Sequence, residues 1–241
     1  MIVIRCKNYD ECSKAASDIF KDALKANPNM ILGLATGSSP IGIYQNLIKD
    51  YQNGEISFKN VRTYNLDEYV GITREHPQSY YYFMNDNLFN QVDSNKENVH
   101  VPFAYEGKYE ESCKAYTNEL KQVSVDIQLL GIGANGHIGF NEPNTPFDQE
   151  TFVVTLTEKT REDNKRFFNS IDEVPTHAIT MGIADIMRAK KIVLIACGEN
   201  KAEAVKRLLS GEITTEFPAS ALHNHADVVV VVDDAAYKLV D

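Results

Sequence analysis

The chain has 241 residues and is 43% apolar, so it can bury a sizeable core, and we expect a single domain over residues 1–241. Its 34 Asp and Glu outnumber 24 Lys and Arg, and the net charge of -10 argues against nucleic acid and anionic membranes as partners. No run approaches the roughly 18 apolar residues of a membrane span, and the N-terminus lacks the apolar core of a signal peptide.

Short β-rich runs alternate with helical patterns along almost the whole chain. The elements expected, in chain order, are a helix over 11–26, a strand over 30–35, a helix over 40–51, a strand over 61–65, helices over 80–89 and 110–120, strands over 126–132 and 191–197, a helix over 201–209 and a strand over 227–232. Several strands are apolar on both faces, as a buried parallel sheet requires. The pattern predicts an α/β fold with an open doubly wound, mostly parallel sheet and helices on both faces, Rossmann-like in type. Ligands of such sheets bind at the carboxyl ends of the strands, so we expect the functional residues on the loops there.

The four cysteines are scattered along the sequence and show no CxxC spacing. They are Cys6, Cys12, Cys113 and Cys197. This arrangement favours reduced thiols in the core of a cytoplasmic protein.

A turn of small residues joins the strand over 30–35 to the next helix. Thr36, Gly37, Ser38 and Ser39 offer free backbone N–H groups and three hydroxyls, which suits an anion at the start of a helix. Ser39 can cap the helix, and Pro40 suits its first turn. An ordinary capped turn is the alternative, and the absence of a following Gly-Lys-Ser/Thr rules out a Walker loop.

Two adjacent carboxylates, Asp67 and Glu68, follow the strand over 61–65. One of them can face the same crevice as the small-residue turn. A carboxylate in a partly dry site is a suitable base for removing a proton next to a carbonyl or imine carbon. The alternative is a solvated pair on a surface turn.

The richest motif covers residues 130–143, with four glycines between positions 131 and 139. His137 can relay a proton near neutral pH, and Asn135 and Glu142 are placed to orient its ring. No second ligand stands at metal spacing from His137, so we predict no metal site. The other histidines are interpreted as structural hydrogen-bonding groups: His76, His100, His177, His223 and His225.

Taken together, these motifs resemble the glucosamine-6-phosphate deaminase family over roughly residues 30–225. The blocks that carry the resemblance are 34–40, 65–69, 76–80 and 133–143, followed by 164–168, 180–183, 198–202 and 218–220. The resemblance implies conversion of glucosamine 6-phosphate and water to fructose 6-phosphate and ammonia, in amino-sugar catabolism. It implies no metal or organic cofactor, because the ammonium and carbonyl of the substrate themselves make the C2 proton acidic.

The resemblance also assigns the site residues. It places the base for enolisation on Asp67, and the group that opens the sugar ring on Asn135, His137 and Glu142. The phosphate ligands are residues with donor groups or positive charge: Thr36, Gly37, Ser38 and Ser39 of the turn, with Arg166 and Lys201. The two cations would supply the positive pocket that an acidic chain otherwise lacks.

Two positions depart from the pattern of many relatives. Asn135 stands where many carry Asp, and an amide cannot stabilise an imidazolium as a charge does. His137 is therefore expected to depend more on Glu142. The turn over 37–39 reads Gly-Ser-Ser where others have Gly-Gly-Thr, which keeps a hydroxyl.

Two other functions remain open on the sequence alone. A 6-phosphogluconolactonase-like hydrolase would lack residues 141–143 in this form. A sugar-phosphate-sensing module without turnover would not need Asp67, His137 and Glu142 together.

Some relatives are hexamers that N-acetylglucosamine 6-phosphate activates, partly through basic residues after the Asn-Glu-Pro block. Here residues 144–155 contain no Lys or Arg and carry Asp148 and Glu150 instead. The chain also ends soon after the last predicted strand. We therefore expect a non-allosteric monomer or small homo-oligomer with hyperbolic kinetics.

Overall fold

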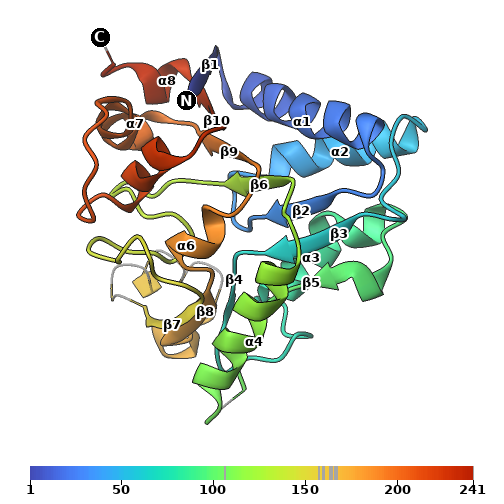
Figure 1. Cartoon of the computed structure of the whole chain (residues 1–241), viewed down its shortest axis with the longest axis vertical. Coiled ribbons are helices and arrows are strands. Elements are labelled where there is room, and N and C mark those ends of the chain that lie inside the picture. Colours follow the sequence, from blue (N-terminus) through green and yellow to red (C-terminus); the bar gives the residue numbers. More distant parts are fainter. Residues whose placement is uncertain (106, 157, 159–160, 163–164, 166–167, 241) are drawn as a thin grey trace.

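The structure is a computed structural model that describes residues 1–105, 107–156, 158, 161–162, 165 and 168–240. It contains a large parallel sheet and a small antiparallel sheet, with helices packed around them (Figure 1). No helix in these ranges is long and apolar enough to cross a membrane.

The large sheet has the strand order β1-β10-β9-β6-β2-β3-β5, and each of its pairings is parallel. Its strands are β1 (Ile2–Cys6), β2 (Ile31–Leu34), β3 (Arg62–Asn65), β5 (Val99–His100), β6 (Ile127–Leu130), β9 (Lys191–Ala196) and β10 (Val228–Asp233). The five predicted strands are β2, β3, β6, β9 and β10, so the predicted α/β fold with a mostly parallel sheet is confirmed. The edge strands β1 and β5 were not predicted.

The helices of the described residues follow the predicted ranges closely, with α6, α8 and the short 3-10 turns in addition. Their bounds are α1 (Tyr9–Ala26), α2 (Ile41–Gln52), α3 (Tyr80–Asn87), α4 (Tyr109–Gln122), α6 (Ile183–Ile186), α7 (Ala202–Leu209) and α8 (Asp234–Tyr237), with 3-10 turns η1 (Phe89–Gln91), η2 (Lys96–Asn98), η4 (Ile171–Glu173), η5 (Glu199–Lys201) and η6 (Pro218–Asn224).

Helix α1 begins where the Asn8 side chain accepts a hydrogen bond from the backbone N–H of Glu11, and acidic residues in the first turn suit the positive end of the helix dipole. It packs beside α2 and over β1, β9 and β10 (Figure 1). Helix α2 begins differently from the prediction. Pro40 is its N-cap residue and no side chain caps it, so Ser39 does not serve as the cap.

The small sheet was not predicted. It consists of β4 (Asp67–Tyr69), β8 (His177–Thr180) and β7 (Phe152–Thr155), paired antiparallel in the order β4-β8-β7. Leu66 connects the two sheets, since its N–H donates to the carbonyl of Leu34 in β2 (3.1 Å) and its carbonyl accepts from Met181 after β8 (2.7 Å).

Strands β2 and β6 lie side by side at the centre of the large sheet, and the direction in which successive strands are added reverses between them. From β2 the sheet continues through β3 to β5, and from β6 it continues the other way to β9 and β10. Such a switch point leaves a crevice at the carboxyl ends of the two strands. The turn over 36–39 and the loop over 131–143 leave the sheet at this crevice.

Candidate active site

The turn after β2 and the loop after β6 touch each other, as the switch point requires. A Cβ atom on Gly131 would lie 3.7 Å from Oγ of Ser39. Gly37 and Ser38 are exposed, and Thr36 and Ser39 are half-buried. The donors of the turn are therefore open to a ligand in the crevice.

Tyr9 holds this turn from the first turn of α1. Its hydroxyl lies 3.1 Å from the carbonyl oxygens of both Ser38 and Ser39, and it accepts a hydrogen bond from the N–H of Gly42 (2.9 Å). With its carbonyls held by Tyr9, the turn keeps its N–H groups and hydroxyls for other partners. No sequence signal identified Tyr9, because it precedes the turn by almost thirty residues.

Lys201 lies at the same edge of the sheet. It ends η5, after β9, and lines a cavity of about 860 Å³ together with Ser38, Ser39 and Tyr9. Gly198 lies three residues before Lys201, and its φ of 92° is in the left-handed region that favours glycine. The structure therefore brings the predicted serine donors and one predicted cation to one cavity. The other predicted cation, Arg166, lies outside the described residues.

Asp67 is in strand β4 and not on a loop or a surface turn. Its side chain is buried, with the residue 6% exposed, and its register partner in β8 is Thr180. Burial, and then the negative charge of Glu68, raise the pKa of Asp67 from 3.8 to about 8. A carboxyl group of this kind has the basicity of a general base that works near neutral pH.

Glu68, the second carboxylate of the pair, has a structural role. It is 1% exposed and accepts backbone hydrogen bonds from Tyr69, Tyr80 and Tyr81 at 2.8–2.9 Å. Burial raises its pKa, and these three bonds act in the opposite direction. Glu68 thereby fixes the start of α3 against β4 and holds the strand that carries Asp67.

His137, Asn135 and Glu142 form a hydrogen-bonded chain on the loop after β6. Nδ1 of His137 lies 2.7 Å from Oδ1 of Asn135, and Nδ2 of Asn135 donates to Oε2 of Glu142 at 2.7 Å. The carboxylate of Glu142 is farther from the ring, with Oε1 at 3.8 Å from Nδ1. The shorter contact of the ring is thus with Asn135, while Glu142 orients the amide and places a negative charge near the ring.

This chain of contacts selects one tautomer of the neutral His137 ring. The carboxylate of Glu142 only accepts, so it requires the amide nitrogen of Asn135 and turns the amide oxygen toward the ring. That oxygen also only accepts, so Nδ1 of His137 carries the proton and Nε2 is the unprotonated nitrogen of the ring. The side chain of His137 is 34% exposed, which leaves the ring accessible from the crevice.

The glycines of this loop make room for its side chains. A Cβ atom on Gly133 would lie 2.2 Å from the ring of His137, and one on Gly136 would lie 2.2 Å from the ring of Phe217. Gly136 also has a φ of 84°. The backbone of the loop thus supports the His137 ring from one side and packs on the turn before η6 from the other.

The same loop passes next to Asp67. A Cβ atom on Gly139 would lie 3.7 Å from Oδ2 of Asp67 and 3.1 Å from Oγ1 of Thr180. The buried side chain of Asn141 fixes this approach by donating to the carbonyl of Met181 (2.9 Å) and to a carbonyl of its own loop. The carboxyl group of Asp67 and the loop of His137 therefore adjoin the same crevice.

An aromatic cluster borders the crevice on the side of the small sheet. The ring of Tyr69 lies 4.8 Å from that of Tyr80 and 6.0 Å from that of Phe168, between centroids. These three residues, with Gly37 and Ser38, line a cavity of about 220 Å³. The rings exclude water beside β4, which is consistent with the raised pKa of Asp67.

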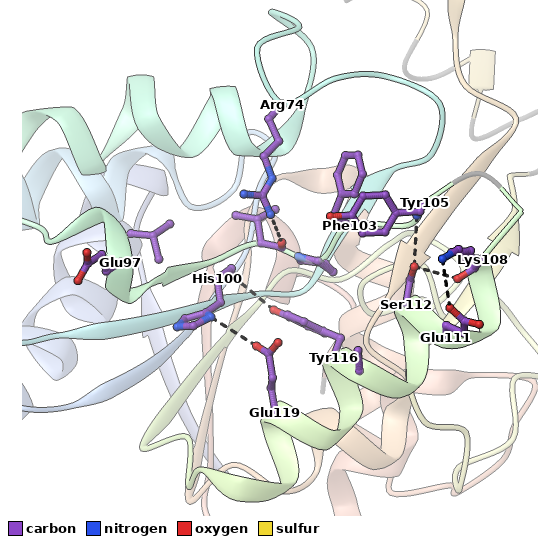
Figure 2. A pocket seen from close by; sticks show the side chains of 14 residues that line it. Arg74, Glu97, His100, Phe103, Tyr105, Lys108, Glu111, Ser112, Tyr116 and Glu119 are labelled. Carbon is purple, nitrogen blue, oxygen red and sulfur yellow. Dashed lines mark hydrogen bonds and ion pairs between the residues drawn. The ribbon is translucent and has the colours of Figure 1, made fainter.

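Another cavity, of about 530 Å³, lies between β5 and α4 and contains none of the predicted site residues (Figure 2). The His100 ring faces Glu119 there, with Nδ1 and Oε2 3.4 Å apart. Tyr116 links the cavity to the strand before Asp67, because its hydroxyl donates to the carbonyl of Asn65 (2.7 Å).

The remaining histidines make local polar contacts, as predicted; for example, Nε2 of His223 lies 2.6 Å from the carbonyl of Leu208 and Nε2 of His225 lies 2.6 Å from that of Ala189. Within the described ranges no three His, Cys, Asp or Glu side chains are grouped so that they could hold a metal ion.

Comparison with known proteins places the chain in a family. Residues 7–231 match the family described as glucosamine-6-phosphate isomerases/6-phosphogluconolactonase. A glucosamine-6-phosphate deaminase of Thermoanaerobacter pseudethanolicus is 53% identical over 241 residues, which cover 100% of this chain and 95% of the relative. One of Clostridium perfringens is 51% identical over 240 residues and 99% of each chain.

Solved structures agree with this result. One described as a monomeric glucosamine-6-phosphate deaminase has a TM-score of 0.96 and 48% identity, and the match covers 99% of this chain and 100% of that one. The 6-phosphogluconolactonase of Trypanosoma brucei, at 18% identity and a TM-score of 0.80 over 100% and 98% of the two chains, shares the fold. The chain therefore belongs to the glucosamine-6-phosphate isomerase/6-phosphogluconolactonase family.

Proposed function

We propose that this protein is a glucosamine-6-phosphate deaminase, which isomerises glucosamine 6-phosphate and removes its amino group by hydrolysis, giving fructose 6-phosphate and ammonia. The observation that carries the proposal is the buried carboxyl group of Asp67, with its pKa raised to about 8, beside the loop of His137 at the switch point. The relatives at 53% and 51% identity bear the same name.

In this proposal His137 opens the sugar ring. Nε2 takes the proton of the anomeric hydroxyl and delivers a proton to the ring oxygen, while Asn135 holds Nδ1–H and Glu142 holds Asn135. The positive charge that forms on the ring lies 3.8 Å from the Glu142 carboxylate, which stabilises it.

Asp67 then acts as the base of the isomerisation. Its carboxylate removes the proton from C2 and returns a proton at C1, which leaves an imine at C2 for water to attack before ammonia departs. At pH 7 about a tenth of a group with a pKa near 8 is ionised. The ammonium of the bound substrate favours the ionised form, so substrate binding itself promotes the active state of Asp67.

The phosphate of the substrate would be held by Thr36, Gly37, Ser38 and Ser39 with Lys201 and Arg166. The shared cavity of Ser38, Ser39 and Lys201 supports this assignment. Anchoring a remote phosphate orients the reacting carbons and lowers the entropic part of the barrier. The reaction as written requires no metal or organic cofactor, because protons and water are its only other reactants.

We further propose that the enzyme acts as a single-domain monomer without an allosteric effector. The neighbour at 48% identity is described as monomeric. In the stretch over 144–155, Glu150 forms ion pairs with Lys121 (2.6 Å) and Arg188 (3.1 Å), so these nearby cations are already occupied by a carboxylate. Nucleic acid and membranes are not proposed as partners of this acidic chain.

A coupled assay for fructose 6-phosphate formed from glucosamine 6-phosphate, together with an ammonia assay, tests the proposal. Equal molar amounts of the two products are expected. Hydrolysis of 6-phosphogluconolactone without deamination would replace the proposal with the lactonase function. Binding of glucosamine 6-phosphate without turnover would indicate a sensing module.

A further inference from the structure

Three of the four cysteines meet near the candidate phosphate cavity. Cys6 in β1 is the register partner of Asp233 in β10, and Val232 in β10 is the partner of Ala196 in β9. Cys197, the residue after Ala196, therefore lies level with Asp233 and Cys6. Residues at one level of a parallel sheet point to the same face, and here that face is covered by α1.

Cys12 approaches this face from the first turns of α1. It is 0% exposed, and Cys6 and Cys197 pack against the hydrophobic cluster to which it belongs. The neighbouring thiol of Cys197, burial and the thiol of Cys6 raise the pKa of Cys12. Cys12 and Cys197 thus share the buried space between α1 and the end of β9.

Cys197 differs from Cys12 in its access to solvent. It is half-buried and lines the cavity of about 860 Å³ with Ser38, Ser39 and Lys201. A small oxidant that enters this cavity reaches the sulfur of Cys197 before that of Cys12.

The geometry excludes Cys6 as a disulfide partner of Cys197 and favours Cys12. Cys6 and Cys197 flank β10, one on each side, so their Cα atoms are about 9.5 Å apart at the usual strand spacing. A disulfide requires Cα atoms within about 7 Å of each other, so these two cannot be joined without moving the backbone. Cys12, which comes from the helix that covers this face, is the cysteine that Cys197 can reach.

We propose that Cys12 and Cys197 form an oxidation-sensitive pair, and that hydrogen peroxide converts the pair to a disulfide beside the candidate phosphate cavity. The thiolate of Cys197 attacks hydrogen peroxide, which yields a sulfenic acid and, after protonation, water. The sulfur of Cys12 then attacks the sulfenic sulfur, forming the disulfide as the hydroxyl leaves with a proton as a second water. Two thiols and one peroxide thus give one disulfide and two waters, and a dithiol reductant reverses the step.

The effect on catalysis rests on the proposed function. Tyr9, which holds the carbonyls of Ser38 and Ser39, lies one helical turn before Cys12 in α1. A disulfide changes the spacing between α1 and the end of β9, and these two elements bear Tyr9 and the approach to Lys201. Oxidation is therefore expected to weaken phosphate binding and to raise the KM for glucosamine 6-phosphate several-fold.

The test treats the intact protein with hydrogen peroxide, then alkylates the remaining thiols and maps the peptides by mass spectrometry. We expect one disulfide that joins the peptides of Cys12 and Cys197, with Cys113 alkylated as a free thiol. A linked pair of other composition, or a sulfinic acid on Cys197 without any disulfide, would overturn the proposal. This mapping does not depend on the substrate.

The kinetic arm compares Cys12→Ser with Cys113→Ser, a control in a separate hydrophobic cluster. Oxidation should raise the KM of the wild type and of Cys113→Ser, with recovery in dithiothreitol, and should leave the KM of Cys12→Ser unchanged. An equal rise in Cys12→Ser contradicts the mechanism. If reduced wild type does not turn over glucosamine 6-phosphate, the proposed function fails, and the peptide map still decides whether the pair exists.

Discussion

Replacing Asp67 by Asn should abolish catalysis and stabilise the fold. In the folded protein Asp67 is buried and its pKa is raised from 3.8 to about 8. Between these values the unfolded chain has lost the Asp67 proton while the folded protein still binds it. The folded state therefore loses stability as the pH rises from about 4 to about 8, and Asn, which has no charge, removes this loss.

The size of the effect follows from the shift. A rise from 3.8 to about 8 spans about 4 pH units, which at 1.36 kcal/mol per unit corresponds to about 6 kcal/mol above pH 8. At pH 7 the corresponding figure is about 4 kcal/mol, and near pH 4 it is close to zero. These are upper values, because partial opening of the site admits water and reduces the cost.

Urea unfolding of wild type and Asp67→Asn at pH 5, 7 and 8 measures this difference. We expect the variant to gain stability with pH relative to wild type, and to retain less than about a tenth of the wild-type turnover, a loss of at least ~1.4 kcal/mol in transition-state stabilisation. Exchange of the C2 proton in deuterated water should vanish with it. A stability difference independent of pH would refute the buried-carboxyl argument, and turnover above a tenth would refute the role as base.

Asp185→Asn is the matched control. Asp185 is also buried, at 4% exposed, but its Oδ2 accepts hydrogen bonds from the hydroxyl of Thr117 (2.9 Å) and from the N–H (2.7 Å) and hydroxyl (2.8 Å) of Thr151. Loss of charge there weakens satisfied bonds, so the substitution should destabilise the fold by about 1–3 kcal/mol.

Three further predictions concern the ligands of the site. Lys201→Ala and Arg166→Ala should each weaken binding of glucosamine 6-phosphate by about 1.5–3 kcal/mol in calorimetry. Lys206→Ala, at an exposed position, is the control. Equal binding of glucosamine with and without phosphate would contradict the assignment. Asn135→Asp should raise the pKa of His137 in an NMR titration, because a carboxylate favours the imidazolium; an unchanged pKa would show that the ring does not sense this position. Initial rates should follow a hyperbola with or without N-acetylglucosamine 6-phosphate, and a sigmoidal curve that the analogue makes hyperbolic would disprove the non-allosteric proposal.

The sequence predicted the parallel sheet well because its strands are apolar and buried on both faces, which leaves a clear local pattern. The small sheet gave no such pattern. Strand β4 is three residues long and begins with Asp67 and Glu68, which are rare in strands, and its partner β8 lies more than a hundred residues away. A pairing of that kind depends on contacts that no window of sequence contains.

The candidate site was likewise predicted only in part. The strand-end rule predicted functional residues on loops at the carboxyl ends of the strands, and the resemblance added Lys201. In the structure the turn after β2 adjoins the loop after β6 and shares a cavity with Lys201 after β9. For Asp67 the sequence left open a partly dry site and a solvated turn, since two adjacent carboxylates are typical of the latter, and the structure shows the residue buried in a strand. The packing of Cys197 against the cluster that contains Cys12 was missed as well, because a helix from one end of the chain and a strand from the other produce it.

The position of Leu66 has a consequence for how the chain tolerates changes in length. It is the single residue between β3 and β4, and its backbone is bonded to Leu34 in one sheet and to Met181 beside the other. An insertion or deletion of one residue at this joint would rotate Asp67 to the opposite face of β4. The connection over 70–79, which has no such double attachment, is the place where grafted segments or length variants should leave the carboxyl group aimed at its crevice.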